Sequence, residues 1–263
     1  MNPESTIPVA PALSMPEPLQ TIFFWVSLVA AIGMLIYAIF VARRFGSFIP
    51  VFLVIGAFCS IPLESLAGYL GHVVHPAGGS IALFSAVDRT IPWHIALGYT
   101  AGFGAVYLVI YQKALHGTLY RSTVFKTAAT TAVLYFLGET IGVSTGLWVY
   151  FEPQPLWIWK MTEPPIWGIL NASSEIFGAC LIVFLLPHLT GIKQALVIVI
   201  CPIATLMAHF GAGFPWYNAI NSSASPAFMT ATTFLSMGLA FVVWWISSIL
   251  ATTHDNSIKT AKR

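Results

Sequence analysis

Long apolar runs alternate with short polar segments along almost the whole chain. Seven runs have about 20 residues each, the length at which a helix crosses a ~30 Å hydrocarbon core. The predicted spans are residues 21–42, 49–70, 91–111, 126–148, 166–187, 194–213 and 227–250. We therefore predict an all-α, polytopic membrane protein with one bundle of seven transmembrane helices over residues 21–250. An N-terminal segment, 1–20, precedes this single domain, and a tail, 251–263, follows it.

Composition supports a membrane protein and excludes an ordinary soluble enzyme. Of the 263 residues, 57% are hydrophobic and 8% are charged, against roughly 25% charged residues in a typical soluble domain. The net charge of +2 forms no basic stripe of the kind that binds nucleic acid. The expected partners are the lipid bilayer and a lipophilic small molecule, with no nucleic acid, and the oligomeric state stays open.

The basic residues predict the orientation, because positively charged loops stay on the cytoplasmic side. Arg89 and Lys160 fall on one side of the predicted bundle, and all other Lys and Arg fall on the opposite side. The larger group comprises Arg43, Arg44, Lys113, Arg121, Lys126, Lys193, Lys259, Lys262 and Arg263. We therefore expect the N-terminus outside, the C-terminus in the cytoplasm, and the long connections 71–90 and 149–165 outside. The second connection is rich in Trp and Pro, which favours an interfacial aromatic belt, a lid over a cavity, or both.

Five of the predicted spans each carry one clear ionisable residue. Such groups are costly in a membrane and usually face the interior of a bundle. Counted at 1.5 Å per residue, all five fall in the outer half of the bilayer, which predicts one polar cavity that opens outward. The five residues are Glu64, His94, Glu139, Glu175 and His209.

Helical spacing adds neighbours to these groups. Trp167, Asn171 and Glu175 repeat every four residues and share one face. Tyr135 lies one turn before Glu139, so the candidate substrate-binding residues include Tyr135, Asn171, Trp167 and His94. A stripe of His94, Gly98 and Gly102 predicts a close approach of a neighbouring helix at the two glycines.

Two histidines follow Glu64 at the outer end of the second span. His72 and His75 are three residues apart, so both rings can approach one ion, with Glu64, Asp88 or His94 as further ligands. Pro76 and the glycines after it end the helix there, which weakens the case for a metal. We expect no metal and no other cofactor, and place His72, His75 and Asp88 among the substrate-binding residues. If a metal is bound, the predicted ligands are His72, His75 and His94.

Several segments together resemble a known family. They are Pro62-Leu-Glu64-Ser, Gly71-His72-Val-Val-His75-Pro, Asp88-Arg-Thr-Ile-Pro-Trp93, Gln154-Pro-Leu, and Pro165-Ile-Trp167-Gly-Ile-Leu-Asn171-Ala. Over about positions 50–180 the chain resembles the membrane-bound spirocyclase family typified by the AveC protein of avermectin biosynthesis. The resemblance implies a membrane enzyme that closes a dihydroxy-ketone of a polyketide into a spiroketal with loss of water, sometimes acting as a dehydratase. The family is widespread in actinobacteria, which implies a bacterial cytoplasmic membrane, and no catalytic residue is transferred from it.

The residues themselves favour acid–base chemistry in a dry cavity. An acid protonates a ketone or hydroxyl group, a base accepts a proton, and the walls fix the geometry, without a cofactor. We assign Glu64 or Glu139 as the acid and Glu175 or His209 as the base. The same groups would serve terpene cyclisation or a double-bond shift, so the substrate is polyketide- or isoprenoid-like. Two other classes stay open: a non-catalytic binder or permease of a lipid-like ligand, and a metal-dependent intramembrane hydrolase or oxygenase.

Overall fold

A bundle of long helices makes up most of the protein. The computed structural model describes residues 8–157 and 164–261, the last of these, 254–261, by backbone alone. Short 3-10 helices, η1 (Leu186–His188) and η2 (Gly191–Leu196), connect α6 to α7. The α-helices are α1 (Glu17–Phe45), α2 (Ile49–Cys59), α3 (Pro62–Leu70), α4 (Trp93–Leu115), α5 (Arg121–Thr145), α6 (Pro165–Leu185), α7 (Val197–Ile220) and α8 (Pro226–Ala261).

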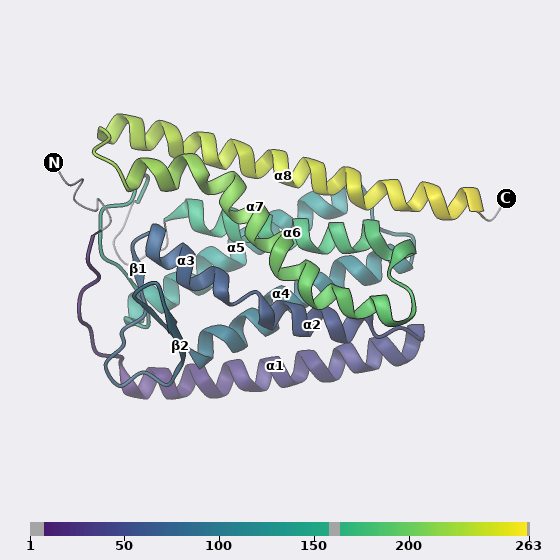
Figure 1. Ribbon diagram of the computed structural model, residues 1–263, viewed down its shortest axis with the longest axis horizontal. Coiled ribbons are helices and arrows are strands. Elements are labelled where there is room, and N and C mark those ends of the chain that lie inside the picture. The colour runs from purple at the N-terminus through teal and green to yellow at the C-terminus, as the bar shows by residue number, and fades with distance from the viewer. Residues whose placement is uncertain (1–7, 158–163, 262–263) are drawn as a thin grey trace.

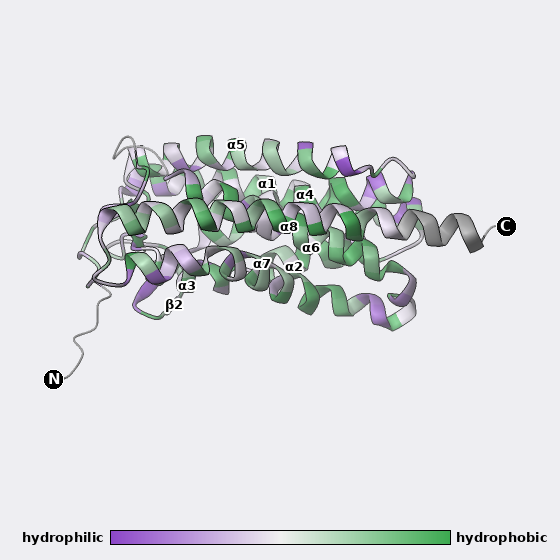
Figure 2. Cartoon of the chain, turned by 90° about the horizontal axis from the view of Figure 1, so that it is seen from above, coloured by the Kyte–Doolittle hydropathy of each residue, from purple (hydrophilic) through white to green (hydrophobic). Residues whose placement is uncertain are grey.

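The long helices run side by side along the longest axis of the molecule (Figure 1). Helix α6 packs against α4, α5, α7 and α8, and α1 lies at the edge of the bundle against α2 and α4. The short strands gather at one end of the bundle, where α1 begins, and α8 ends at the other (Figure 1). Hydrophobic residues cover most of the helix length, and hydrophilic residues gather mainly toward the two ends (Figure 2).

Among the described residues, six spans are long and apolar enough to cross a membrane. Helix α5, which matches the predicted span 126–148, is the exception. It is long enough, but Arg121, Lys126, Glu139 and several threonines make it less apolar. Six apolar spans in an all-helical bundle fit an integral membrane protein and confirm the coarse prediction from the hydrophobic pattern.

The predicted span 49–70 is two helices in the structure. Pro62 has no backbone N–H to donate into the preceding turn, so α2 ends at Cys59 and α3 begins at Pro62. The hydroxyl of Ser60 donates to the carbonyl oxygen of Gly56 at 2.9 Å and satisfies one group at the break. The interruption places Glu64 in the first turn of a new helix.

The last helix extends further than predicted. Helix α8 continues through most of the predicted tail, 251–263, as far as Ala261. Residues 239–263 contain neither Gly nor Pro, the two residue types that most often end a helix. Lys262, Arg263 and Lys160, which entered the charge count, lie outside the described residues.

The two predicted outer connections meet at one end of the bundle. Strand β1 (Val73–Val74) pairs antiparallel with β4 (Val149–Tyr150), which joins the first connection to the second. Strands β2 (Ala82–Ala86) and β3 (Arg89–Pro92) form a hairpin. Its two-residue turn has positive φ at both positions, as a type I′ turn requires. Strands β1, β2 and β3 contact α3, the helix that carries Glu64.

Candidate functional site

A cavity of about 410 Å³ lies between α4 and α5, at the end of the bundle that carries the strands. Its walls are mostly apolar, but several side chains that can exchange or share a proton line it together. They come from α3, the segment after β1, α4, α5, the segment after α5, and α6. These residues are Glu64, His75, His94, Tyr99, Tyr135, Glu139, Trp148 and Glu175.

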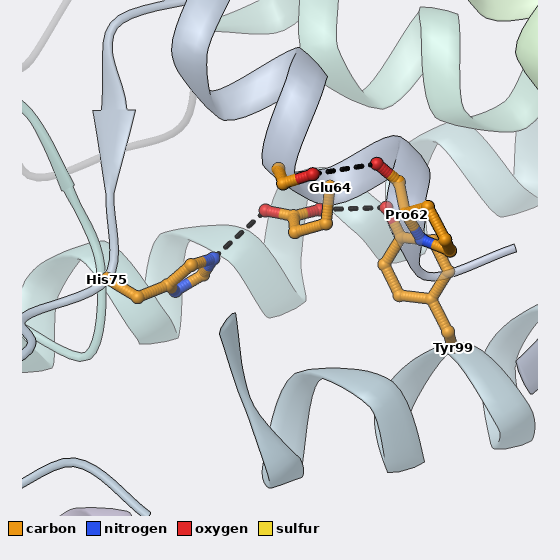
Figure 3. A network of polar contacts seen from close by, with 5 residues as sticks. Pro62, Glu64, His75 and Tyr99 are labelled. Carbon is orange, nitrogen blue, oxygen red and sulfur yellow. Dashed lines mark hydrogen bonds and ion pairs between the residues drawn. The ribbon is translucent and has the colours of Figure 1, made fainter. Parts of the chain in front are cut away.

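Glu64 lies between two hydrogen-bond partners (Figure 3). His75 Nε2 is 3.0 Å from Glu64 Oε1, and the hydroxyl of Tyr99 donates to Glu64 Oε2 at 2.7 Å. Both carboxylate oxygens are therefore engaged. His75 Nδ1, in contrast, is buried and has no hydrogen-bond partner among the described residues.

Glu175 is fully buried on α6, and one of its two oxygens has a hydrogen-bond partner among the described residues. The hydroxyl of Tyr135 donates to Glu175 Oε1. Glu175 Oε2 has no partner among the described residues, and the same holds for Nε2 of His94, a residue that is 3% exposed. Buried polar groups are normally paired because an unpaired one costs about 1–3 kcal/mol. Several such atoms line one cavity, among them Glu175 Oε2, His94 Nε2 and His75 Nδ1, and they indicate a place where a ligand contributes the missing partners.

Glu139 and Trp148 complete the polar part of the cavity. Glu139 interacts electrostatically with Glu64 and lies beside Trp148. The Trp148 indole packs over Gly142, where an added Cβ would lie only 1.9 Å from ring atom Cζ2. Trp148 also contacts the ring of His75 edge-on, with centroids 5.9 Å apart. Because Gly142 has no side chain, the Trp148 indole can lie against α5 and contact the His75 ring.

His209 lies behind this cavity rather than on its wall. Its Nδ1 is 3.2 Å from the Ser174 hydroxyl, and its Nε2 is 2.8 Å from the Tyr217 hydroxyl. Both ring nitrogens are engaged and the side chain is fully buried. Trp167 packs against it with ring centroids 6.2 Å apart, also off the cavity wall. These contacts join α6 to α7 outside the cavity lining.

The remaining predicted site residues lie elsewhere. Asp88 is exposed in the turn between β2 and β3, and Asn171 is half-buried on α6 outside the cavity lining. His72 Nε2 is 3.0 Å from Asn221 Oδ1, a contact that joins β1 to the end of α7. His72, His75 and His94 do not form a ligand set, since no three His, Cys, Asp or Glu side chains among the described residues are placed to hold a metal ion.

The glycine stripe on α4 differs from the expectation. Gly98 and Gly102 were expected to allow close packing of a helix, but both are exposed and line the cavity. A Cβ on Gly98 would meet nothing within 4 Å, and one on Gly102 only the Tyr135 hydroxyl at 3.5 Å. The prediction of close helix packing at these glycines is therefore wrong, because the space beside them is the cavity itself.

Tyr99 and Trp148 are site residues that the sequence reasoning missed. Ile95, Tyr99, Gly102 and Val106 follow a helical i, i+4, i+7, i+11 pattern and all line the cavity. That spacing is visible in the sequence and indicates Tyr99. Trp148 follows the end of α5, and nothing in its local sequence shows that its ring turns back over Gly142.

No family model, curated protein or solved structure matches the chain.

Proposed function

We propose that the protein is a membrane-embedded acid–base enzyme, of cyclase, dehydratase or isomerase type, that acts on a lipophilic polyketide- or isoprenoid-like substrate. One observation carries the proposal: the Glu64–His75 pair and the half-paired carboxyl group of Glu175 line the same mostly apolar cavity. A base and an acid in one desolvated pocket are what proton-transfer catalysis requires.

His75 is the proposed base, and Glu64 positions it. With its proton on Nε2, His75 donates to Glu64 Oε1 and leaves Nδ1 as an acceptor. The carboxylate then fixes the ring and stabilises the imidazolium that forms, as in other carboxylate–histidine pairs. Tyr99 holds the second oxygen of Glu64 and so limits rotation of the carboxylate.

Glu175 is the proposed acid. Its Oε1 accepts a hydrogen bond from the Tyr135 hydroxyl. In the protonated carboxyl group the acidic proton therefore lies on Oε2, the oxygen that has no partner among the described residues. One proton passes from Glu175 to a carbonyl, hydroxyl or alkene of the substrate, and another passes from the substrate to His75. The hydrogen bonds thus favour Glu175 as acid and Glu64 on the basic side, the reverse of the roles assigned from sequence. Glu139 is a second candidate acid.

The narrower proposal is spiroketal closure. The resemblance to the spirocyclase family points to this member of the reaction class, and acid–base closure with loss of water uses only the groups present. The surplus of basic residues opposite the strands supports a bundle of seven spans with the strand end outside, in the cytoplasmic membrane of a bacterium. In that orientation, the cavity lies in the outer half of the bilayer.

Conservative substitutions test the proposed roles. Purified protein is incubated with vesicles of the organism's own lipid extract, and the conversion of any lipid is followed by mass spectrometry. Glu175→Gln removes the acidic proton and retains the shape, so we expect turnover to fall by about 100-fold or more. His75→Gln should have a similar effect. Glu17→Gln, at an exposed position in the first turn of α1, is the matched control and should leave turnover unchanged.

Retention of full turnover in both Glu175→Gln and His75→Gln would contradict the proposal. An absence of any conversion by the wild-type protein, together with retention of a bound lipid, would instead indicate a binding protein.

A further inference from the structure

One side of the cavity is not closed by helix packing. Helix α5 packs along α6 and α8, while α4 packs along α1, α2 and α6, and α4 and α5 make only slight contact with each other. The cavity lies between these two helices. Its wall on this side therefore faces the surface that the apolar helices present to the bilayer.

Three glycines and one leucine line the cavity at this side, and all four residues are exposed. Gly98 and Gly102 on α4 and Gly138 on α5 all line the cavity, and all three are exposed. A Cβ at Gly98 or Gly138 would meet nothing within 4 Å. Leu134, one turn before Gly138, lines the cavity and is 62% exposed. We call these four residues the rim.

Polarity increases from the rim inward. The four rim residues have no polar side chain, and the half-buried Ser27 of α1 adds one hydroxyl to the cavity lining. The inner wall carries the fully buried Glu175 and the 3% exposed His94, each with a polar atom that has no partner among the described residues. The Glu64 side chain is 20% exposed and its partner His75 only 5%. An opening that is apolar at its mouth and polar at its base fits a molecule with one polar end and one apolar part.

We infer that the cavity takes its substrate sideways from the bilayer, through an opening between α4 and α5 bordered by the rim. The substrate class is an amphipathic lipid-like molecule whose oxygen-bearing end reaches Glu175 and His94 while its hydrocarbon part lies at the rim. This inference rests on the proposed function for the meaning of the polar end. The route itself depends only on the exposed glycines and the separation of the two helices.

The test uses two light-activated probes in phospholipid vesicles that contain the purified protein. Both are the same long-chain primary alcohol, with a diazirine either beside the hydroxyl group or at the far end of the chain. We expect the first probe to form adducts with inner residues such as Glu175 and Tyr135. The second should form adducts at Leu134, located by mass spectrometry of peptides.

Leucine at the rim should close the opening. Gly98→Leu and Gly138→Leu place a side chain into open space, and leucine has a better helix propensity than glycine, so the helices should be retained. Inner labelling should fall by about tenfold, the ratio that corresponds to ~1.4 kcal/mol in affinity. Gly238→Leu on α8 is the control, since it is an equally exposed helical glycine with no atom near an added Cβ and lies off the cavity.

Two results would overturn the inference. Inner labelling that is unchanged in both rim variants shows that the probe enters by another path. Failure of the far-end probe to label Leu134 in the wild-type protein shows that the rim is covered, for example by a second copy of the chain.

The two proposals fail in different ways. If Glu175→Gln keeps full turnover while Gly98→Leu and Gly138→Leu block inner labelling, the lateral opening is supported and the acid–base role of Glu175 is contradicted. If Glu175→Gln abolishes turnover while Gly98→Leu and Gly138→Leu leave inner labelling unchanged, the catalytic proposal is supported and the lateral opening is contradicted.

Discussion

At the scale of single residues, Gly142 and Gly138 lie one turn apart on α5 but face different surroundings. An added Cβ at Gly142 would lie 1.9 Å from the Trp148 indole, whereas one at Gly138 meets nothing within 4 Å. We expect Gly142→Ala to displace Trp148 and to lower the free energy of unfolding by about 1–3 kcal/mol. Gly138→Ala should be neutral or stabilising by up to ~1 kcal/mol. Thermal unfolding in detergent, followed by tryptophan emission, compares the two, and equal effects would contradict this packing.

His72 gives a pH dependence to the strand end of the bundle. Burial lowers the pKa of His72 below its ordinary value of 6.5, and the positive charge of Arg89 adds to this, although the hydrogen bond with Asn221 and the charge of Glu152 oppose it. The folded protein therefore resists protonation where the unfolded chain accepts it. The resulting stability is complete above pH 6.5 and is lost as the pH falls toward the lower pKa of the folded state.

The substitution His72→Asn should weaken this pH dependence. Asparagine tolerates the positive φ of 59° at this position. We expect the loss of melting temperature between about pH 7.5 and about pH 5.5 to be smaller in the variant than in the wild type. His116→Asn, at the exposed end of α4, is the comparison variant that removes a histidine elsewhere in the chain. An unchanged pH dependence in His72→Asn would assign it to other groups.

Sequence alone identified part of the candidate site. Glu64, Glu139, Glu175 and His94 stand out as ionisable groups in apolar runs, and the structure brings these four to one cavity. His209 has the same sequence signal, but the hydroxyl groups of Ser174 and Tyr217 engage both of its ring nitrogens behind the cavity. The surroundings of His209 differ from those of the four cavity residues in which side chains of other helices contact them. The spacing of residues along one helix carries no information about such contacts.

At the scale of elements, two prolines shape α7. Pro202 and Pro215 lie inside it, and each removes a hydrogen bond from the helix. Beside Pro215, the backbone N–H of Trp216 donates to the Ser236 hydroxyl on α8 at 3.0 Å. This contact joins α7 to α8 through a buried backbone donor.

Removal of that hydroxyl should be costly. We expect Ser236→Ala to lower the free energy of unfolding by about 0.5–1.5 kcal/mol, since it removes a buried hydrogen bond between two helices. Ser247→Ala on the same helix is the control. Its hydroxyl, also buried, donates only to the Val243 carbonyl oxygen of its own helix, so its loss should cost less. Both variants are compared by chemical denaturation in detergent. An equal loss of unfolding free energy in the two would contradict the larger contribution expected from Ser236.

Hydrophobic length predicted the existence of the elements better than their ends. The run 49–70 is apolar throughout except for Ser60, Glu64 and Ser65, so its periodicity hides the break that Pro62 imposes. Strands β1 and β4 were not predicted, because their pairing joins segments that are far apart in the sequence. Local propensity carries no information about such a pairing. The β2–β3 hairpin is local, but its turn residues, Val87 and Asp88, lack the Asn-Gly or Asp-Gly signature of a tight hairpin.

At the scale of the whole molecule, orientation can be tested by labelling. Ser85→Cys is exposed in the β2–β3 hairpin, and Ser122→Cys is exposed at the start of α5, near the opposite end. With the strand end outside, a membrane-impermeant maleimide added to intact cells should label the first variant and not the second, with the unsubstituted protein as baseline. The reverse pattern would place the cavity in the inner half of the bilayer.

The central claim is that residues lining the cavity transfer protons to and from a lipophilic substrate and add neither water nor oxygen to it. The most direct measurement is the mass difference between the lipid consumed and the lipid formed when wild-type protein is incubated with vesicles of the organism's lipid extract. We predict a product of equal mass or one lighter by a single water, and none in Glu175→Gln. A product that has gained water or oxygen would contradict the account and indicate a hydrolase or an oxygenase.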